Sequence, residues 1–192
     1  MIVYCATGNP GKLREFQLAA PDFDVQKLPV AVPAPDETGD TFEANAAEKA
    51  IAYGQHIDGY LFADDSGLEV DALGGDPGVR SARFAGEHAT DEQNNTLLLE
   101  RLCGVQNRTA RFVCVIALVK DGRLVKTFRG AVEGRMLDAP RGSGGFGYDP
   151  LFYYEPFACT FGEAPIERKV TVSHRAIALE AMFAYLRELR GN

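Results

Sequence analysis

The stretch IVYCATGNPGKLREF, residues 2–16, decides how the chain begins to fold. Residues 2–6 form a short apolar run that predicts a buried strand, and the positions from Leu13 onward show helical spacing. Between the two, Asn9 is a favoured N-cap residue and Pro10 suits the first position of a helix. We therefore predict a strand, a tight loop and a helix, with backbone N–H groups at the helix start that can bind an anion.

The loop between this strand and helix is not a Walker A motif. That motif would require glycine at position 6 and serine or threonine at position 13, where this chain has Ala6 and Leu13. A strand-to-helix turn with small residues and one lysine, Lys12, can still hold phosphate through N–H groups and charge. An ordinary capped turn is the alternative, and the pattern alone leaves both open.

Two adjacent acids follow a second apolar run. Residues 60–63 predict a buried strand that delivers the segment Asp64–Gly67 at its carboxyl end, where α/β sheets bind ligands. Adjacent carboxylates there are costly unless a cation or a water network accepts them. Because side chains alternate along a strand, Asp64 and Asp65 should point to opposite sides, so at most one of them dominates the chemistry. A structural turn is the alternative interpretation.

The remaining pattern predicts helices and a hairpin around a mixed sheet. Helix starts are predicted at three capping residues, Thr41, Thr90 and Ser173. The apolar segments 112–119 and 123–128, joined by Asp121-Gly122, predict an antiparallel hairpin. We expect an α/β fold in which residues 1–192 form one compact, lobed unit.

Composition argues against several classes of protein. The chain has 192 residues, of which 46% are hydrophobic, so it can bury an ordinary core. Its formal net charge of -7 disfavours wrapping of nucleic acid, which needs a broad basic surface. No apolar run approaches the roughly 20 residues of a membrane span, and the four cysteines show no CxxC pairing. We expect a cytoplasmic protein with buried free thiols and with no nucleic-acid or membrane partner.

Two segments in the second half carry groups suited to a nucleotide. The glycine-rich loop Arg141–Pro150 contains Phe146 and Tyr148, whose rings can stack on a base, although a flexible linker is the alternative. Lys169 and the dipeptide His174-Arg175 place cations or donors near a helix start. These suit an anionic or carbonyl-bearing ligand, and an ordinary basic surface is equally compatible.

Several segments, taken in chain order, form one pattern: Thr7–Lys12, Glu37-Thr38-Gly39, Thr41–Ala46, Asp64–Leu68, Gly74–Val79, Ser81-Ala82-Arg83, Gly144–Phe152 and Ser173-His174-Arg175. This pattern resembles the inosine triphosphate pyrophosphatase family, in the family's order and at compatible spacing from end to end. The resemblance implies an elongated mixed β-sheet flanked by helices, two lobes with a central nucleotide-binding cleft, and a homodimer.

The resemblance also implies a Mg²⁺-dependent reaction. Water attacks the α-phosphorus of ITP, dITP or XTP, and pyrophosphate leaves, which clears deaminated purines from the nucleotide pool. Asp65 looks like the proton acceptor and a Mg²⁺ ligand. Glu37, by itself a solvated loop acid, looks like the second carboxylate ligand. The residues that the resemblance assigns to the substrate are Thr7, Gly8, Asn9, Pro10, Gly11, Lys12, Ser66, Phe146, Gly147, Tyr148, Asp149, Lys169, His174 and Arg175.

Two other functions remain open at this stage. The first is a related pyrophosphatase for modified pyrimidine triphosphates, with similar metal chemistry and a different base-binding surface. The second is a non-catalytic nucleotide sensor that keeps the cleft and does not cleave its ligand. The presence of Asp65, Glu37 and Lys12 argues against the sensor, because binding alone does not need a full set of reactive groups.

Overall fold

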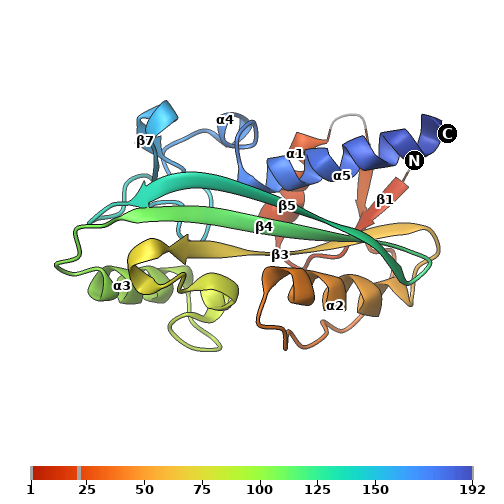
Figure 1. Ribbon diagram of the computed structural model, residues 1–192, viewed down its shortest axis with the longest axis horizontal. Coiled ribbons are helices and arrows are strands. Elements are labelled where there is room, and N and C mark those ends of the chain that lie inside the picture. The colour runs from red at the N-terminus through yellow and green to blue at the C-terminus, as the bar shows by residue number, and fades with distance from the viewer. Residues whose placement is uncertain (1, 21–22, 192) are drawn as a thin grey trace. The chain divides into compact units, whose positions relative to one another are not determined.

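The computed structural model describes residues 2–20 and 23–191 (Figure 1). The strands are β1 (Ile2–Cys5), β2 (Asp24–Lys27), β3 (Tyr60–Val70), β4 (Thr109–Lys120), β5 (Arg123–Met136), β6 (Phe152–Tyr154) and β7 (Cys159–Thr160). The α-helices are α1 (Pro10–Ala19), α2 (Phe42–Gly54), α3 (Asp91–Arg101), α4 (Ile166–Lys169) and α5 (His174–Gly191). Short 3-10 helices are η1 (Asp71–Leu73), η2 (Gly78–Arg83) and η3 (Glu155–Phe157).

The described strands form one mixed sheet, as predicted. Their order is β2-β1-β3-β4-β5-β6-β7. β1 runs parallel to both β2 and β3, with Val3 opposite Val25 and Cys5 opposite Phe62, whereas β5, β6 and β7 pair antiparallel. The turn between β4 and β5 has positive φ at both Asp121 (51°) and Gly122 (73°), which matches the twist of a tight hairpin.

Residue contacts divide the chain into two compact units. Unit 1 comprises the described parts of residues 1–65, 114–130 and 173–192. In this unit α1 and α5 pack together on one face of the strands, and α2 covers the other face (Figure 1). Aromatic pairs hold the α1/α5 side, with the rings of Phe23 and Phe183 stacked at 3.9 Å. The predicted stripe on α2, from Phe42 to Tyr53, is buried.

Unit 2 comprises residues 66–113 and 131–172. Its core is built around three phenylalanine rings, Phe112, Phe152 and Phe161, with centroid distances of 4.5 Å and 5.1 Å to Phe152. Helix α3 contributes Leu98, which is fully buried, and begins with the predicted capping box of Thr90 and Gln93. Across residues 2–20 and 23–191, we find no helix with the length and apolar content needed to cross a bilayer.

The strand that carries the paired acids is longer than predicted. We expected Asp64–Gly67 to follow the strand, but β3 continues through them to Val70. Leu68 and Val70 are fully buried, and the Leu68 N–H donates to Ser81 Oγ at 2.8 Å. Gly67 permits this close packing, because an added Cβ would lie 2.4 Å from a backbone oxygen. The extension therefore depends on contacts with a segment distant in sequence.

The sequence pattern also missed four short elements: β2, β6, β7 and α4. Each is only two to four residues long. Neither the twofold period of a strand nor the 3.6-residue period of a helix can be recognised over so few positions.

Candidate active site

The adjacent acids on β3 point to opposite faces of the sheet, as strand alternation predicts. Asp64 faces α1, where the Lys12 ammonium lies 2.8 Å from Asp64 Oδ2. Asp65 faces α2, where Asn45 Nδ2 donates to Asp65 Oδ2 at 3.1 Å. The two carboxylates therefore have separate partners, although they are neighbours in the chain.

Asp64 is a buried acid held in its charged form. Its side chain is 2% exposed, and that burial opposes ionisation. The positive charges of Lys12 and Arg175 outweigh the burial and lower the pKa of Asp64 below its usual value. The Lys12–Asp64 pair consequently fixes the first turn of α1 to the middle of β3.

Asp65 belongs to a cluster on the α2 side that includes a lysine absent from our predictions. Lys49 Nζ lies 2.8 Å from Glu37 Oε1 and 3.4 Å from Asp65 Oδ1. Both predicted metal ligands, Glu37 and Asp65, therefore form ion pairs with the same Lys49 ammonium group. A sequence signal was available, since Asn45 and Lys49 are polar residues four positions apart on a largely apolar helix, which places them on one face.

Asn45 connects the loop of Glu37 to Asp65. It is fully buried; its Oδ1 accepts the Gly39 N–H at 2.8 Å, while its Nδ2 donates to Asp65. Gly39 lacks room for a side chain, because an added Cβ would lie 2.6 Å from Ala44 Cβ. One amide therefore sets the position of both the loop and the carboxylate.

The electrostatics of this cluster suit proton transfer. Burial raises the pKa of Asp65, and the nearby charge of Lys49 opposes this rise without cancelling it. Burial disfavours the Lys49 ammonium, but the charges of Asp65 and Asp64 raise its pKa overall. A carboxylate whose pKa is moved toward neutrality is a better proton acceptor at physiological pH than an ordinary one.

The donor set also fits Mg²⁺. Within residues 2–20 and 23–191, no group of three or more His, Cys, Asp or Glu side chains forms a cage that could hold a metal. Mg²⁺ does not require one, because it usually binds through one or two carboxylates together with waters and substrate phosphates. Glu37 and Asp65 converge on the Lys49 ammonium, which shows that their shared position accommodates positive charge.

The predicted phosphate loop caps α1 with its own side chains. Asn9 is the N-cap, and its Oδ1 accepts the N–H groups of Gly11 (2.8 Å) and Lys12 (3.2 Å). The Asn9 N–H lies 3.2 Å from Thr7 Oγ1. An anion at this helix start must therefore compete with the Asn9 amide for two N–H groups.

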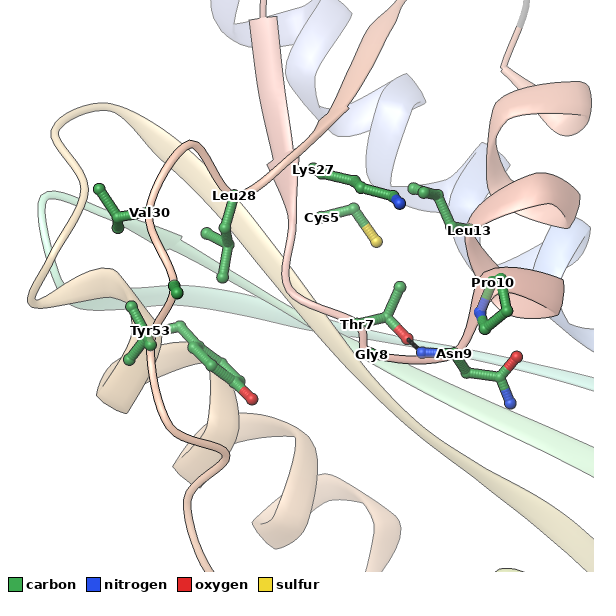
Figure 2. A pocket seen from close by; sticks show the side chains of 12 residues that line it. Cys5, Thr7, Gly8, Asn9, Pro10, Leu13, Lys27, Leu28, Val30 and Tyr53 are labelled. Atoms are coloured by element: carbon green, nitrogen blue, oxygen red, sulfur yellow. Dashed lines mark hydrogen bonds between the residues drawn. The ribbon is translucent and has the colours of Figure 1, made fainter.

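A cavity of about 280 Å³ lies beside this loop, within unit 1. Figure 2 shows the Thr7–Asn9 backbone along one side, with Lys27, Cys5 and Leu13 above it and Tyr53 across from it. Burial raises the pKa of Tyr53, which lies four positions after Lys49 on α2, so the cavity wall and the acid cluster share this helix. Lys27 and Tyr53 were not predicted. The cavity is lined by Cys5, Thr7, Gly8, Asn9, Pro10, Leu13, Lys27, Leu28, Val30, Ala31, Val32 and Tyr53.

In unit 2, the glycine-rich loop is organised by a buried ion pair. Asp149 Oδ2 accepts both the Phe146 N–H at 3.0 Å and the Lys169 ammonium at 2.6 Å. The Lys169 and Asp149 side chains are only 2% and 3% exposed. Lys169 Nζ also lies 5.2 Å from the centre of the Phe146 ring. Phe146 is half-buried, so it retains ring surface for a ligand.

Tyr148 supports the same loop from the core side. It is 4% exposed, and its hydroxyl donates to Ser81 O at 2.7 Å. Of the two aromatic residues predicted to form a base wall, Phe146 therefore has the more accessible ring. Ser66, another predicted substrate contact, is half-buried on β3 directly after Asp65.

The predicted pair at the start of α5 lies in unit 1. Ser173 Oγ accepts the Ala176 N–H at 3.2 Å, as expected of an N-cap. Arg175 Nη1 donates to Glu15 Oε2 at 3.0 Å, and both side chains are almost fully buried. His174 is 1% exposed. The positive charge of Arg175 adds to that of Lys12 in lowering the pKa of Asp64.

Comparisons with known proteins match nearly the whole chain to one family. A model of the Ham1 family matches residues 3–185. A dITP/XTP pyrophosphatase of Acidobacterium capsulatum is 44% identical, and the alignment covers 97% of this chain and 98% of the relative. A dITP/XTP pyrophosphatase of an Exiguobacterium species is 49% identical, with 96% of each chain covered.

Solved structures give the same result. The Ham1 protein of Staphylococcus aureus has a TM-score of 0.86 at 40% identity and covers 98% of this chain and 99% of its own. A Ham1 protein of Coxiella burnetii has a TM-score of 0.87 at 38% identity, with the same coverage. These matches confirm the α/β fold and the resemblance seen in the ordered motifs. The chain therefore belongs to the Ham1 family.

Proposed function

We propose that this protein hydrolyses non-canonical purine nucleoside triphosphates (ITP, dITP and XTP) to the monophosphate and pyrophosphate, and so clears them from the nucleotide pool. The relatives named dITP/XTP pyrophosphatase, which align over nearly the whole chain, support this substrate class. The observation that carries the chemistry is the buried cluster on α2 and β3. There Asn45 and Lys49 hold Asp65, and the same lysine holds Glu37.

The reaction assigns one role to Asp65. A water molecule forms a bond to the α-phosphorus, the bond from that phosphorus to the bridging oxygen of pyrophosphate breaks, and Asp65 accepts the proton of the water. Its raised pKa and its fixed orientation support this role. Asn45 keeps one carboxylate oxygen engaged and leaves the other directed toward Lys49.

Glu37 and Asp65 would hold Mg²⁺ in this scheme. The bound metal would neutralise charge on the phosphate oxygens and orient the reacting water. Lys49 and Lys12 supply additional positive charge at α2 and α1. Such fixed cations stabilise the charge that develops on phosphoryl oxygens as pyrophosphate leaves.

The loop Thr7–Lys12 and the neighbouring cavity are proposed to receive the phosphate chain. Binding requires the Asn9 amide to release the N–H groups of Gly11 and Lys12 to the phosphate. Lys27 is a further cation on the cavity wall. Because phosphate is larger and more highly charged than an amide oxygen, it is the stronger acceptor for two N–H groups at a helix start.

Base selection is proposed to depend on Phe146, Asp149 and Lys169, which share one hydrogen-bonded loop of unit 2. A separate proposal, for unit 1, gives His174 and Arg175 a role in base selection. Hypoxanthine and xanthine present an oxygen acceptor where adenine presents an amino donor. A buried donor that faces adenine would lose its partner, at a cost of about 1–3 kcal/mol per group. Turnover of ITP and ATP by the variants His174→Ala and Arg175→Ala tests this assignment, and unchanged selectivity in both variants contradicts it.

The experiment that tests the proposed function measures pyrophosphate release from ITP, XTP, ATP and GTP with Mg²⁺. Wild type is compared with Asp65→Asn and with Asp58→Asn, an exposed acid of the same unit. We expect release from ITP and XTP by wild type and by Asp58→Asn, and none by Asp65→Asn. Binding of all nucleotides without release favours the sensor function, and release from modified pyrimidine triphosphates alone favours the other pyrophosphatase.

The proposed function also includes the oligomeric state, the metal requirement and the location of the enzyme. We propose that it acts as a Mg²⁺-dependent homodimer in the cytoplasm, with a nucleotide as its ligand and no nucleic acid. The net charge of -7 supports the last point, because nucleic-acid binding relies on a broad basic surface. Sedimentation equilibrium tests the dimer, and a purified monomer with full activity contradicts it.

A further inference from the structure

The first turn of α3 presents two polar side chains on one face. Asp91 is the first residue of the helix and Asn95 lies four positions later, so both side chains project from the same side of the helix, one turn apart. Neither was among our predicted site residues. Both contact the glycine-rich loop of unit 2, at a single residue, Gly147.

The two contacts hold Gly147 from both sides of its α-carbon. The Gly147 N–H donates to Asp91 Oδ2 at 2.7 Å, and Asn95 Nδ2 donates to the Gly147 carbonyl at 3.0 Å. The N–H belongs to the peptide plane shared with Phe146, and the carbonyl belongs to the plane shared with Tyr148. Helix α3 therefore orients the backbone on which the Phe146 ring is mounted.

This loop needs external support. Its glycines at 142, 145 and 147 have φ values of 80°, 71° and 62°, a region that most residues avoid. Glycine-rich backbone loses more conformational entropy on ordering than other backbone. Hydrogen bonds at 147, one of them to a charged carboxylate, offset part of this cost at the point next to Phe146.

The platform that makes these bonds is itself rigid. Asn94, between Asp91 and Asn95, is 3% exposed. Its Oδ1 accepts the Ala85 N–H at 2.8 Å, and its Nδ2 donates to Ala82 O at 3.1 Å. On the next turn Leu98 is fully buried in the core of unit 2. Because these contacts hold α3 in place, its hydrogen bonds can keep the loop in one conformation.

We propose that Asp91 and Asn95 are positioning residues that hold the Phe146 ring ready to stack on the purine base. The inference rests on the proposed function for its ligand, a non-canonical purine nucleotide, and it concerns residues that act only through Gly147. Because these residues orient the base-binding loop and do not touch the reacting phosphate, their loss changes substrate affinity more than the rate of the chemical step.

The test uses the full-length protein and the variants Asp91→Ala, Asn95→Ala and Asp91→Asn. Each alanine variant is expected to raise KM for ITP about fivefold to tenfold, the effect of one lost hydrogen bond, with kcat within about twofold of wild type. Deuterium uptake in peptides that cover 143–149 should become faster. Asp91→Asn keeps an oxygen acceptor for the Gly147 N–H, so it should restore slow uptake.

Glu92→Ala is the matched control. Glu92 is a second acid in the first turn of α3, so its loss weakens the interaction with the helix dipole just as the loss of Asp91 does. We expect wild-type uptake at 143–149 and a wild-type KM in this variant. The proposal is overturned if both alanine variants keep wild-type uptake there, or if Glu92→Ala changes it equally. If wild type releases no pyrophosphate, the proposed function fails, and the uptake measurement still decides whether α3 holds the loop.

Discussion

The variant Asn45→Ala tests the strongest structural dependence in the acid cluster. The Asn45 amide is fully buried and makes two hydrogen bonds, one with the Gly39 N–H and one with the Asp65 carboxylate. Alanine removes both. The Gly39 N–H then loses its acceptor, and Asp65 loses a donor that also orients it.

The expected loss of stability follows from these two bonds. A neutral hydrogen bond contributes about 1 kcal/mol and a bond to a charged group about 2 kcal/mol, whereas the better helix propensity of alanine returns about 0.5 kcal/mol. We therefore expect the free energy of unfolding to fall by about 2.5 kcal/mol. For a chain of this size that corresponds to a melting temperature lower by about 5–10 °C.

Urea denaturation followed by circular dichroism measures this change directly. Ile51→Ala, an exposed position on the same helix, is the control and should stay within about 0.5 kcal/mol of wild type. In folded Asn45→Ala, kcat for ITP should fall about tenfold or more, because Asp65 is free to rotate. A stability loss below about 0.5 kcal/mol, or an unchanged kcat, would refute the bridging role of Asn45.

Three further predictions follow from packing, thiol burial and the metal. Gly67→Ala should destabilise the fold by about 1–3 kcal/mol in urea, because the new Cβ would lie 2.4 Å from Ser81 Oγ; wild-type stability would show that the strand can shift. Burial raises the pKa of Cys5 and Cys114, so iodoacetamide at neutral pH should modify the exposed Cys103 first. Peptide mass spectrometry measures the labelling of each cysteine, and equal labelling contradicts this order. A chelator should abolish pyrophosphate release and added Mg²⁺ should restore it; activity that survives chelation argues against a metal.

Local signals predicted much of the fold. The N-cap Asn9, the capping box at Thr90 and the Asp121-Gly122 turn each depend on residues close together in the chain, and the structure confirms all of them. The expectation of buried thiols is confirmed for Cys5 and Cys114 and wrong for Cys103, which is exposed, whereas Cys159 is half-buried. Composition gives the average tendency of cysteine to be buried, and it does not place an individual cysteine.

The partners in the site could not be predicted in the same way. Lys12 and Asp64 are 52 positions apart, and Lys49 meets Glu37 across 12 positions, so these pairings depend on how helices pack on the sheet. The motifs predicted Asp65 and Glu37 as the metal ligands. They did not show that Lys49 and Asn45 hold one of them, because a helix pattern gives the face of a residue and not its partner.

The central claim is tested most directly by supplying ITP and ATP together, in equal amounts, in water labelled with heavy oxygen. Mass spectrometry of the products identifies both the base chosen and the phosphorus attacked. The account predicts inosine monophosphate that carries the label, unlabelled pyrophosphate, and little adenosine monophosphate. Equal consumption of ATP would contradict the base selection, and labelled pyrophosphate or an inosine diphosphate product would contradict attack at the α-phosphorus.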